Sequence, residues 1–226
     1  QCLYVTNIIR LHHCIFLGNH AFDDGGAVEV GIALGNLKLI NNRSIYINNT
    51  SSQSGGALHT VDINHIINIY CHFSNNSART FGGAIHFETE RSSVDGKIDN
   101  ILSVFRENVG NKGGAFNIES VAIITNYKIK SKSNLAIVRG GAFYITKAEK
   151  VINKNSKFER NLAKFEGGSM YFTLVKNVIN VKCIFLGNIA RFSNGGAFYL
   201  EQGTYLTSKR SFFIGSKSQQ GSALFV

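Results

Sequence analysis

The sequence predicts an all-β fold, a single-stranded, right-handed parallel β-helix of about eight coils that occupies residues 1–226 as one domain. Three observations predict it. A double landmark recurs eight times, short segments alternate apolar and polar residues, and two columns of Asn recur once per repeat. A coil of this kind buries its apolar face only by stacking on its neighbours, so the repeats are expected to share one continuous core.

The first landmark is a Gly-Gly-Ala triplet, which recurs at intervals of 26 to 31 residues. Copies begin at Gly25, Gly55, Gly82, Gly113, Gly140, Gly167, Gly195 and Gly221, with Gly-Gly-Ser in the sixth and Gly-Ser-Ala in the eighth. The second landmark is an aromatic residue followed three positions later by Asn. It reads Phe16/Asn19, Tyr46/Asn49, Phe73/Asn76, Phe105/Asn108, Phe158/Asn161 and Phe185/Asn188, with Ser131/Asn134 and Phe213/Ser216 as degenerate copies.

Stacking at ~4.8 Å turns each repeat position into a column along the axis. Side-chain amides at this spacing hydrogen-bond from coil to coil, so the two Asn columns are expected to be structural ladders at two turns. The first ladder contains Asn19, Asn49, Asn76, Asn108, Asn134, Asn161 and Asn188. The second contains Asn41, Asn68, Asn100, Asn126, Asn153 and Asn180. The aromatic landmarks are expected to form a buried stack that is interrupted at Ser131.

Three of the four cysteines occupy one repeat position, two residues before the aromatic landmark, where most other copies carry Ser. Cys14, Cys71 and Cys183 fall in coils one, three and seven. Even the nearest two are therefore ~9.6 Å apart along the axis, beyond the reach of a disulfide, and we expect buried free thiols. Cys2, near the start of the sequence, is a candidate for pairing with a residue outside the chain.

Composition and charge narrow the class of protein. No run of 18 apolar residues and no signal-peptide pattern occur, so no membrane span is expected, and the opening Gln1 favours a processed part of a longer product. Residues 1–113 carry 8 basic and 9 acidic groups, whereas residues 114–226 carry 16 and 5. The basic half indicates either a solvated face or a surface for acidic glycans or lipid head groups. Nucleic acid is not expected, because no basic motif is interleaved with aromatic residues.

Residues that follow each Gly-Gly-Ala should alternate between the core and the outside. The outward column contains Glu29, His59, His86, Asn117, Tyr144, Tyr171, Tyr199 and Phe225. Its aromatic members, Tyr144, Tyr171, Tyr199 and Phe225, are the candidate binding residues, expected as an exposed stripe that stacks sugars or contacts a neighbouring molecule. A self-stacking stabiliser covered by its own loop is the alternative. Glu29, His59 and His86 could bind a divalent metal, but stacked polar ladders are commoner, so no metal is expected.

Asn-x-Ser/Thr triplets supply candidate glycosylation sites at Asn42, Asn48 and Asn75. Asn48 and Asn75 precede ladder residues, so their side chains should face solvent. A fourth triplet begins at the ladder residue Asn49, which should be buried and unmodified.

The paired motif, Phe-x-x-Asn followed by Gly-Gly-Ala and an apolar residue, resembles the repeats of chlamydial polymorphic outer-membrane proteins and of similar protist surface proteins with a pectin-lyase-like fold. The resemblance extends over nearly the whole chain. It implies surface display and adhesion, and it supplies no catalytic residues.

These observations favour an extracellular or cell-surface structural protein, a subunit or segment of a surface fibre that stacks head to tail, because residues 221–226 form a strand motif with no polar cap. A carbohydrate-binding adhesin module is the alternative. A glycan-active lyase or hydrolase is more distant, because the acids are scattered: Asp62 stands alone, and Glu88, Glu90, Asp95 and Asp99 fall in one polar insertion. No enzyme activity, catalytic residue or cofactor is expected.

Overall fold

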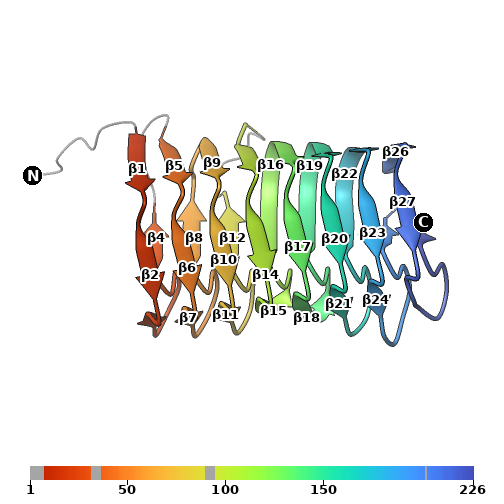
Figure 1. Ribbon diagram of the computed structural model, residues 1–226, viewed down its shortest axis with the longest axis horizontal. Coiled ribbons are helices and arrows are strands. Elements are labelled where there is room, and N and C mark those ends of the chain that lie inside the picture. The colour runs from red at the N-terminus through yellow and green to blue at the C-terminus, as the bar shows by residue number, and fades with distance from the viewer. Residues whose placement is uncertain (1–7, 32–36, 90–94, 202) are drawn as a thin grey trace, which may run out of the picture.

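The computed structural model describes residues 8–31, 37–89, 95–201 and 203–226, and these residues form a parallel β-helix of eight coils. The coils follow one another along the long axis from the amino end to the carboxyl end (Figure 1). Each strand pairs in parallel with the equivalent residues of the next coil, as Phe73 of coil three does with Phe105 of coil four. The predicted fold class and number of coils are confirmed.

The strands form three sheets, of 13, 8 and 7 strands, called sheets A, B and C. Sheet B contains β2 (Ile15–Leu17), β6 (Ile45–Ile47), β10 (His72–Ser74), β14 (Val104–Arg106), β17 (Lys130–Lys132), β20 (Lys157–Glu159), β23 (Ile184–Leu186) and β27 (Phe212–Ile214). Sheet C contains β3 (His20–Ala21), β7 (Thr50–Ser51), β11 (Ser77–Ala78), β15 (Val109–Lys112), β18 (Leu135–Arg139), β21 (Leu162–Ala163) and β24 (Ile189–Ala190). Sheet A contains β1 (Ile8–His12), β4 (Val28–Val30), β5 (Lys38–Asn42), β8 (Leu58–Val61), β9 (His65–Ile69), β12 (Ile85–Glu88), β13 (Lys97–Ile101), β16 (Phe116–Tyr127), β19 (Phe143–Lys154), β22 (Met170–Val181), β25 (Phe198–Leu200), β26 (Tyr205–Lys209) and β28 (Leu224–Phe225).

Residues with positive φ produce the sharp turns between the sheets. One column of them lies between sheets B and C and directly precedes the first ladder position: Gly18, Asn48, Asn75, Glu107, Ser133, Arg160, Gly187 and Gly215. A second column lies between sheets A and B: His13, Arg43, Tyr70, Leu102, Lys128, Asn155, Lys182 and Arg210. The left-handed conformation costs about 1–2 kcal/mol for a residue with a Cβ. In the inner coils, hydrogen bonds made by the buried ladder Asn that follows the turn between sheets B and C offset this cost.

The paired glycines of the first landmark are required by the turn into sheet A. Gly140 has a φ of +68°, in the left-handed region. At Gly141 the φ is ordinary, but a Cβ would overlap the carbonyl oxygen of Gly168 and lie 2.6 Å from the carbonyl carbon of Leu162 in the next coil. The first glycine therefore sets the direction of the chain, and the second allows the coils to approach each other.

The first Asn column is a continuous ladder of amide hydrogen bonds. Asn76 shows the pattern: its Oδ1 accepts from the backbone N and from Nδ2 of Asn49, at 3.0 Å each. Its Nδ2 donates to the carbonyl oxygen of Tyr46 and to Oδ1 of Asn108, also at 3.0 Å each. Asn19, in the first coil, is exposed, whereas the remaining ladder residues are fully buried: Asn49, Asn76, Asn108, Asn134, Asn161 and Asn188.

The second Asn column runs through the turn between sheets A and B. Side-chain amides there donate from one coil to the next at 2.8–2.9 Å, from Asn41 as far as Asn180. Tyr46 in the core donates its hydroxyl hydrogen to Oδ1 of Asn41 at 3.1 Å. The buried polar groups at this turn are thus hydrogen-bonded to one another, which removes most of the free-energy cost of burying them.

Aromatic rings stack along the core, as the second landmark predicts. Centroids of Phe16, Tyr46, Phe73 and Phe105 are 4.5–5.2 Å apart and nearly parallel. The stack is interrupted at Ser131, where Phe143 of the same coil fills the space, 6.3 Å from Phe105 and 5.9 Å from Phe158. A small residue at one core position is therefore compensated by a large residue at another.

The cysteines of the described chain are free thiols. Cys71 and Cys183 are buried and Cys14, in the first coil, is partly buried. Burial raises the pKa of the Cys71 and Cys183 thiols, so both stay protonated and unreactive in the folded protein. Cys2 lies outside the described residues.

The Asn76→Ala substitution should lower the free energy of unfolding by on the order of 3 kcal/mol, because it leaves several buried groups of Asn49, Tyr46 and Asn108 without partners. Chemical denaturation would measure the loss. The matched control is Asn177→Ala on the exposed face of β22, which should change stability by less than about 0.5 kcal/mol. Equal stabilities of the two variants would contradict a stabilising role of the ladder.

Candidate functional site on the outer face of sheet A

One column of side chains on the outer face of sheet A contains the sequence-predicted site residues. It joins register partners on β4, β8, β12, β16, β19, β22, β25 and β28, in the order Glu29, His59, His86, Asn117, Tyr144, Tyr171, Tyr199 and Phe225. Their neighbours along each strand point into the core. The column, called the outer column, divides into a polar half in the first four coils and an aromatic half in the last four.

Rings of the aromatic half stack face to face. Tyr144 to Tyr171, Tyr171 to Tyr199 and Tyr199 to Phe225 are separated by 5.0–5.2 Å between centroids. The exposed stripe expected from the alternation is not observed, because Tyr144 is only 7% exposed and Tyr171 only 2%. Tyr199 and Phe225 are partly buried. The expectation of exposure was wrong for the first two rings, and sugar or protein binding by the column stays a prediction.

Cationic side chains cover the buried tyrosines. The Lys112 ammonium lies 5.2 Å from the centre of the Tyr144 ring, and the Arg139 guanidinium lies 5.1 Å from that of Tyr171. Arg139 also pairs with Glu166 at 2.7 Å. On the opposite side of the column the Tyr171 hydroxyl donates to Glu201. Burial raises the pKa of both tyrosines. Tyr144 and Tyr171 are therefore closed to solvent, and the four rings of this half stack on one another.

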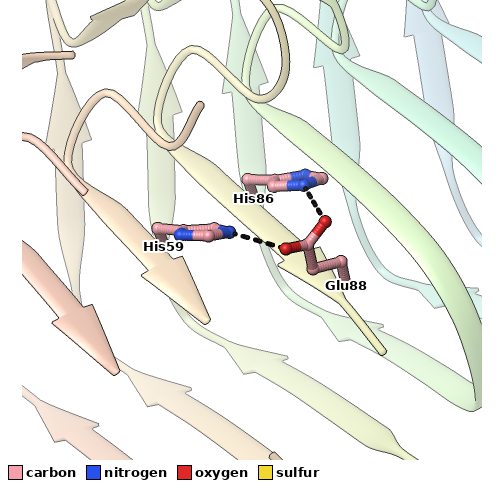
Figure 2. Close-up of side chains that lie close together, drawn as sticks. All are labelled: His59, His86 and Glu88. Carbon is pink, nitrogen blue, oxygen red and sulfur yellow. Dashed lines mark hydrogen bonds and ion pairs between the residues drawn. The ribbon is translucent and has the colours of Figure 1, made fainter. Parts of the chain in front are cut away.

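In the polar half, two imidazole rings and one carboxylate meet. His59 on β8 and His86 on β12 stack with centroids 5.1 Å apart and planes within 6°. Glu88, two residues beyond His86 on the same strand, spans both rings: one carboxylate oxygen lies 3.3 Å from His59 Nε2 and the other 3.2 Å from His86 Nε2 (Figure 2). Both histidines are buried, whereas the Glu88 side chain is 36% exposed.

The remaining ring nitrogens of this cluster face further polar groups. His59 Nδ1 lies 3.9 Å from a carboxylate oxygen of Asp24 and 3.8 Å from one of Glu29. His86 Nδ1 is 3.0 Å from Nδ2 of Asn117. Among the described residues, neither ring nitrogen of His59 has a hydrogen-bond partner, and the buried Asn117 Oδ1 has none. The cluster therefore holds buried polar atoms whose hydrogen-bonding capacity is unused.

His59 and Glu88 form the main ion pair of the cluster. Burial alone would lower the pKa of His59, but the Glu88 carboxylate 3.3 Å away and the charges of Asp24 and Glu29 together raise it above the ordinary value of 6.5. The two imidazoles lower the pKa of Glu88 well below its usual range, chiefly through His59. Glu88 is accordingly a carboxylate throughout the neutral range, and His59 holds a proton more readily than an ordinary histidine.

The acidic residues are less scattered than the sequence predicted. Glu88 meets both histidines, and Asp62, which was expected to stand alone, accepts a hydrogen bond from Thr89 at 2.7 Å and lines a small cavity together with Asp95. His86 and Glu88 are two residues apart on one strand, so their side chains lie on the same face. From this spacing the sequence alone could have predicted that Glu88 lies beside the outer column. Glu90 lies outside the described residues.

The candidate glycosylation sites differ in exposure. Asn48 and Asn75 are exposed and Asn42 is partly buried, whereas Asn49 is fully buried. Asn48 and Asn75 also hold turn positions with positive φ, which Asn tolerates better than most residues. Their presence at these positions therefore has a conformational cause in addition to any glycan.

Comparison with known proteins identifies one repeat. Residues 70–88 match the family model of the Chlamydia polymorphic membrane protein repeat. The matched segment runs from the second landmark of coil three through β12 to Glu88, and it confirms the resemblance seen in the sequence. No curated protein and no solved structure gave a match. Within the described ranges, no helix has the length and apolar character needed to cross a membrane.

The contribution of the His59–Glu88 pair to stability should depend on pH. Because the folded-state pKa of His59 is raised, its contribution is present below its ordinary value of 6.5 and is lost as pH rises through the folded value. Because the pKa of Glu88 is lowered, its contribution is present above 4.5 and is lost as pH falls through the folded value. The pair should therefore stabilise most between about pH 4.5 and 6.5.

The Glu88→Gln variant tests this. In the presence of a chelator, its melting temperature should fall below that of the parent by ~2–4 °C near pH 5.5, which corresponds to about 1 kcal/mol after allowance for solvent screening. The difference should shrink by about pH 8. Glu107→Gln, at an exposed pair with Arg106, is the matched control. A Glu88→Gln deficit that is the same at every pH would rule out this ion pair.

Proposed function

We propose that the chain is a structural segment of a cell-surface protein, a β-helical shaft that extends along one axis and has no catalytic role. The match of residues 70–88 to a membrane-protein repeat supports a place at the cell surface. The observation that carries the structural role is the first Asn ladder, which links every coil from Asn19 to Asn188 by side-chain hydrogen bonds that are buried from Asn49 onward. A stack joined in this way resists bending and separation of its coils.

The ladder has a direction, and this supports head-to-tail association. In each step the backbone N–H of an Asn points to the coil on its carboxyl side, as Asn49 N does toward Asn76 Oδ1. The side-chain Oδ1 accepts from the coil on its amino side, as Asn49 Oδ1 does from Asn19. Donors therefore meet acceptors only when the last coil of one unit faces the first coil of the next. We infer that such units stack head to tail into a fibre, a heterologous contact that propagates.

Charge favours the same polarity. The half of the chain formed by residues 1–113 is nearly neutral, whereas residues 114–226 carry 16 basic and 5 acidic groups. Head-to-tail stacking places the basic end of one unit against the nearly neutral end of the next. Tail-to-tail contact would place two basic ends together, at a cost that salt reduces.

Axial association should be measurable by sedimentation velocity and visible as filaments in electron micrographs. The parent should increase in mass with concentration, and Asn19→Ala, which removes the exposed acceptor of the first coil, should associate ~5-fold more weakly, as expected for the loss of about 1 kcal/mol. His20→Ala, at the neighbouring exposed position, is the control and should behave like the parent. A parent that stays monomeric at every concentration would disprove the fibre.

A second candidate function, adhesion to acidic glycans, is favoured by a basic edge on the last four coils. This edge lies at the turn between sheets A and B and contains Lys128, Lys130, Lys154, Lys157, Lys182, Lys209 and Arg210. Lys130 and Lys157 are register partners, so their charges lie one coil apart. A row of cations at this spacing suits a linear polyanion, whose binding releases the counterions of both surfaces.

Heparin is a suitable probe of the basic edge. The double variant Lys128→Glu with Lys182→Glu should bind heparin at least ~10-fold more weakly than the parent, and the binding of the parent should weaken as salt rises. Arg10→Glu with Lys38→Glu makes the same change of net charge in the first two coils and is the matched control. Equal losses in the two double variants would show that net charge, and not the edge, governs binding.

A further inference from the structure

We propose that His59, His86 and Glu88 form a binding site for a divalent metal ion of the Zn²⁺ class on the outer face of sheet A. The three side chains each offer one ligand atom, and these atoms lie within 4.8 Å of one another. Two imidazole nitrogens and one carboxylate oxygen are a donor set that binds zinc in proteins, with water or another ligand in the fourth position. The proposal stands apart from the shaft function and does not depend on it.

The distances within the cluster suit a tetrahedral ion. Zinc bonds of 2.0–2.2 Å place neighbouring ligand atoms ~3.3 Å apart. Glu88 Oε1 lies 3.3 Å from His59 Nε2 and Oε2 lies 3.2 Å from His86 Nε2, so each imidazole nitrogen already has a carboxylate oxygen at a suitable distance. The rings stack in parallel, and bringing both nitrogens around one ion with a single Glu88 oxygen requires rotation of the rings about χ2, a torsion with a broad energy minimum.

The backbone fixes this arrangement. His86 and Glu88 are two residues apart on β12, so both side chains point to the same face. His59 is the register partner of His86 on the neighbouring coil, so its ring lies one strand spacing away. Ligands at i, i+2 and the adjacent strand converge without a loop, which keeps them in place when no metal is bound.

Two unpartnered buried groups indicate that the cluster is more than a stacked polar ladder. His59 is 3% exposed, and neither of its ring nitrogens makes a hydrogen bond within the described chain, although Nε2 faces the Glu88 carboxylate (Figure 2). Leaving buried polar atoms without hydrogen bonds destabilises a fold, so an occupant that uses them would be stabilising. A metal ion between His59 and Glu88 would be bound by His59 Nε2 once that nitrogen carries no hydrogen.

The second such group is Asn117. Its Nδ2 faces His86 Nδ1 at 3.0 Å, an arrangement that leaves the hydrogen on Nε2, directed at Glu88. A half-turn of the amide would bring the unpaired Oδ1 to that place, where it would accept from Nδ1–H and leave the Nε2 lone pair free for the metal, at the loss of the hydrogen bond that Nδ2 donates to Glu119 at 3.2 Å. His59 already has its Nδ1 toward the carboxylates of Asp24 and Glu29, the partners that usually orient a metal-binding histidine.

Binding would exchange protons for the metal. A doubly protonated imidazole releases its Nε2 proton to solvent, whereas a neutral one moves its hydrogen from Nε2 to Nδ1, so each becomes a neutral ligand, and Glu88 binds as a carboxylate. The groups facing His59 are Asp24, Glu29, Glu88 and the His86 ring, and no cation faces it among the ion pairs of the described residues. The local charge thus favours a cation. Glu88 is partly exposed, which leaves an open position for water on its side.

Isothermal titration of the chain with ZnCl₂ at neutral pH is the test. We expect one equivalent of Zn²⁺ per chain, and titration with CoCl₂ should give the intense visible absorption of a four- or five-coordinate ion. His86→Ala and Glu88→Gln should each raise the Kd for Zn²⁺ by more than the ~10–100-fold typical of substituting a residue that only orients a metal ligand. Asn117→Leu should raise it by ~10-fold or more, and Asn117→Asp should keep or lower it.

Two controls separate this site from incidental binding by surface histidines. His65→Asn removes a histidine that also pairs with a carboxylate, Asp99 at 2.8 Å, and should leave the Kd unchanged. His12→Ala with His13→Ala removes an exposed pair of imidazoles 4.4 Å apart and should also have no effect. Circular dichroism of every variant confirms that it folds, and Glu88→Gln tests the site even where a histidine variant fails to fold.

The proposal is overturned if the folded parent binds no Zn²⁺. It is overturned equally if Glu88→Gln leaves binding intact or if the His12/His13 double variant abolishes it. If metal-free Glu88→Gln at pH 8 has the melting temperature of the parent and forms filaments as the parent does, the shaft function does not depend on the metal site. Either proposal can then be disproved without the other.

Discussion

The coil-to-coil register is the constraint on which the rest of the structure depends. Buried amides bond only at the spacing of adjacent strands, so each ladder Asn must lie directly above the last, and the residue before it must adopt the same left-handed turn. Insertions are accommodated only where they leave this register intact. The intervals of 26 to 31 residues differ in length, and yet every ladder position remains aligned. The paired glycines obey the same constraint, because Gly141 has no room for a Cβ beside the next coil.

Register also explains how the outer column can be buried outside the core. Like residues are placed over like, so imidazoles stack on imidazoles and phenols on phenols, and each ring covers its neighbour. Flanking columns add side chains from two sides, with Lys112 and Arg139 on one and Glu88 and Glu201 on the other. Shielded from water in this way, charged groups interact more strongly than on an open surface, as the raised pKa of His59 and the lowered pKa of Glu88 show.

Features that recur in every coil could be predicted from the sequence, whereas features that occur in one coil could not. Ladder residues such as Asn76 could be placed because position in the repeat alone determines their surroundings. The burial of Tyr171 could not be predicted, because it depends on Arg139, which reaches it from a different sheet, and on a single acid, Glu201. Glu88 was placed with the scattered acids because it begins a polar insertion, although its strand position already put it beside His86. Pairwise contacts between columns are set by side-chain length and turn geometry, which a repeat pattern does not encode.

A division of charge along the outer column accounts for the difference between its two halves. In the first three coils the flanking groups are the carboxylates of Asp24 and Glu88, and the column itself contains Glu29 and two imidazoles. From coil four onward the flanking groups include cations, beginning with Lys112, whose ammonium lies over both the Phe81 and the Tyr144 rings. The carboxylates attract a cationic guest at the first end, whereas at the second end the aromatic faces already bind the protein's own cations. The same backbone can thus support a ligand-binding cluster and a closed stabilising stack, because the side chains of the outer column can change from coil to coil without disturbing the Asn ladders.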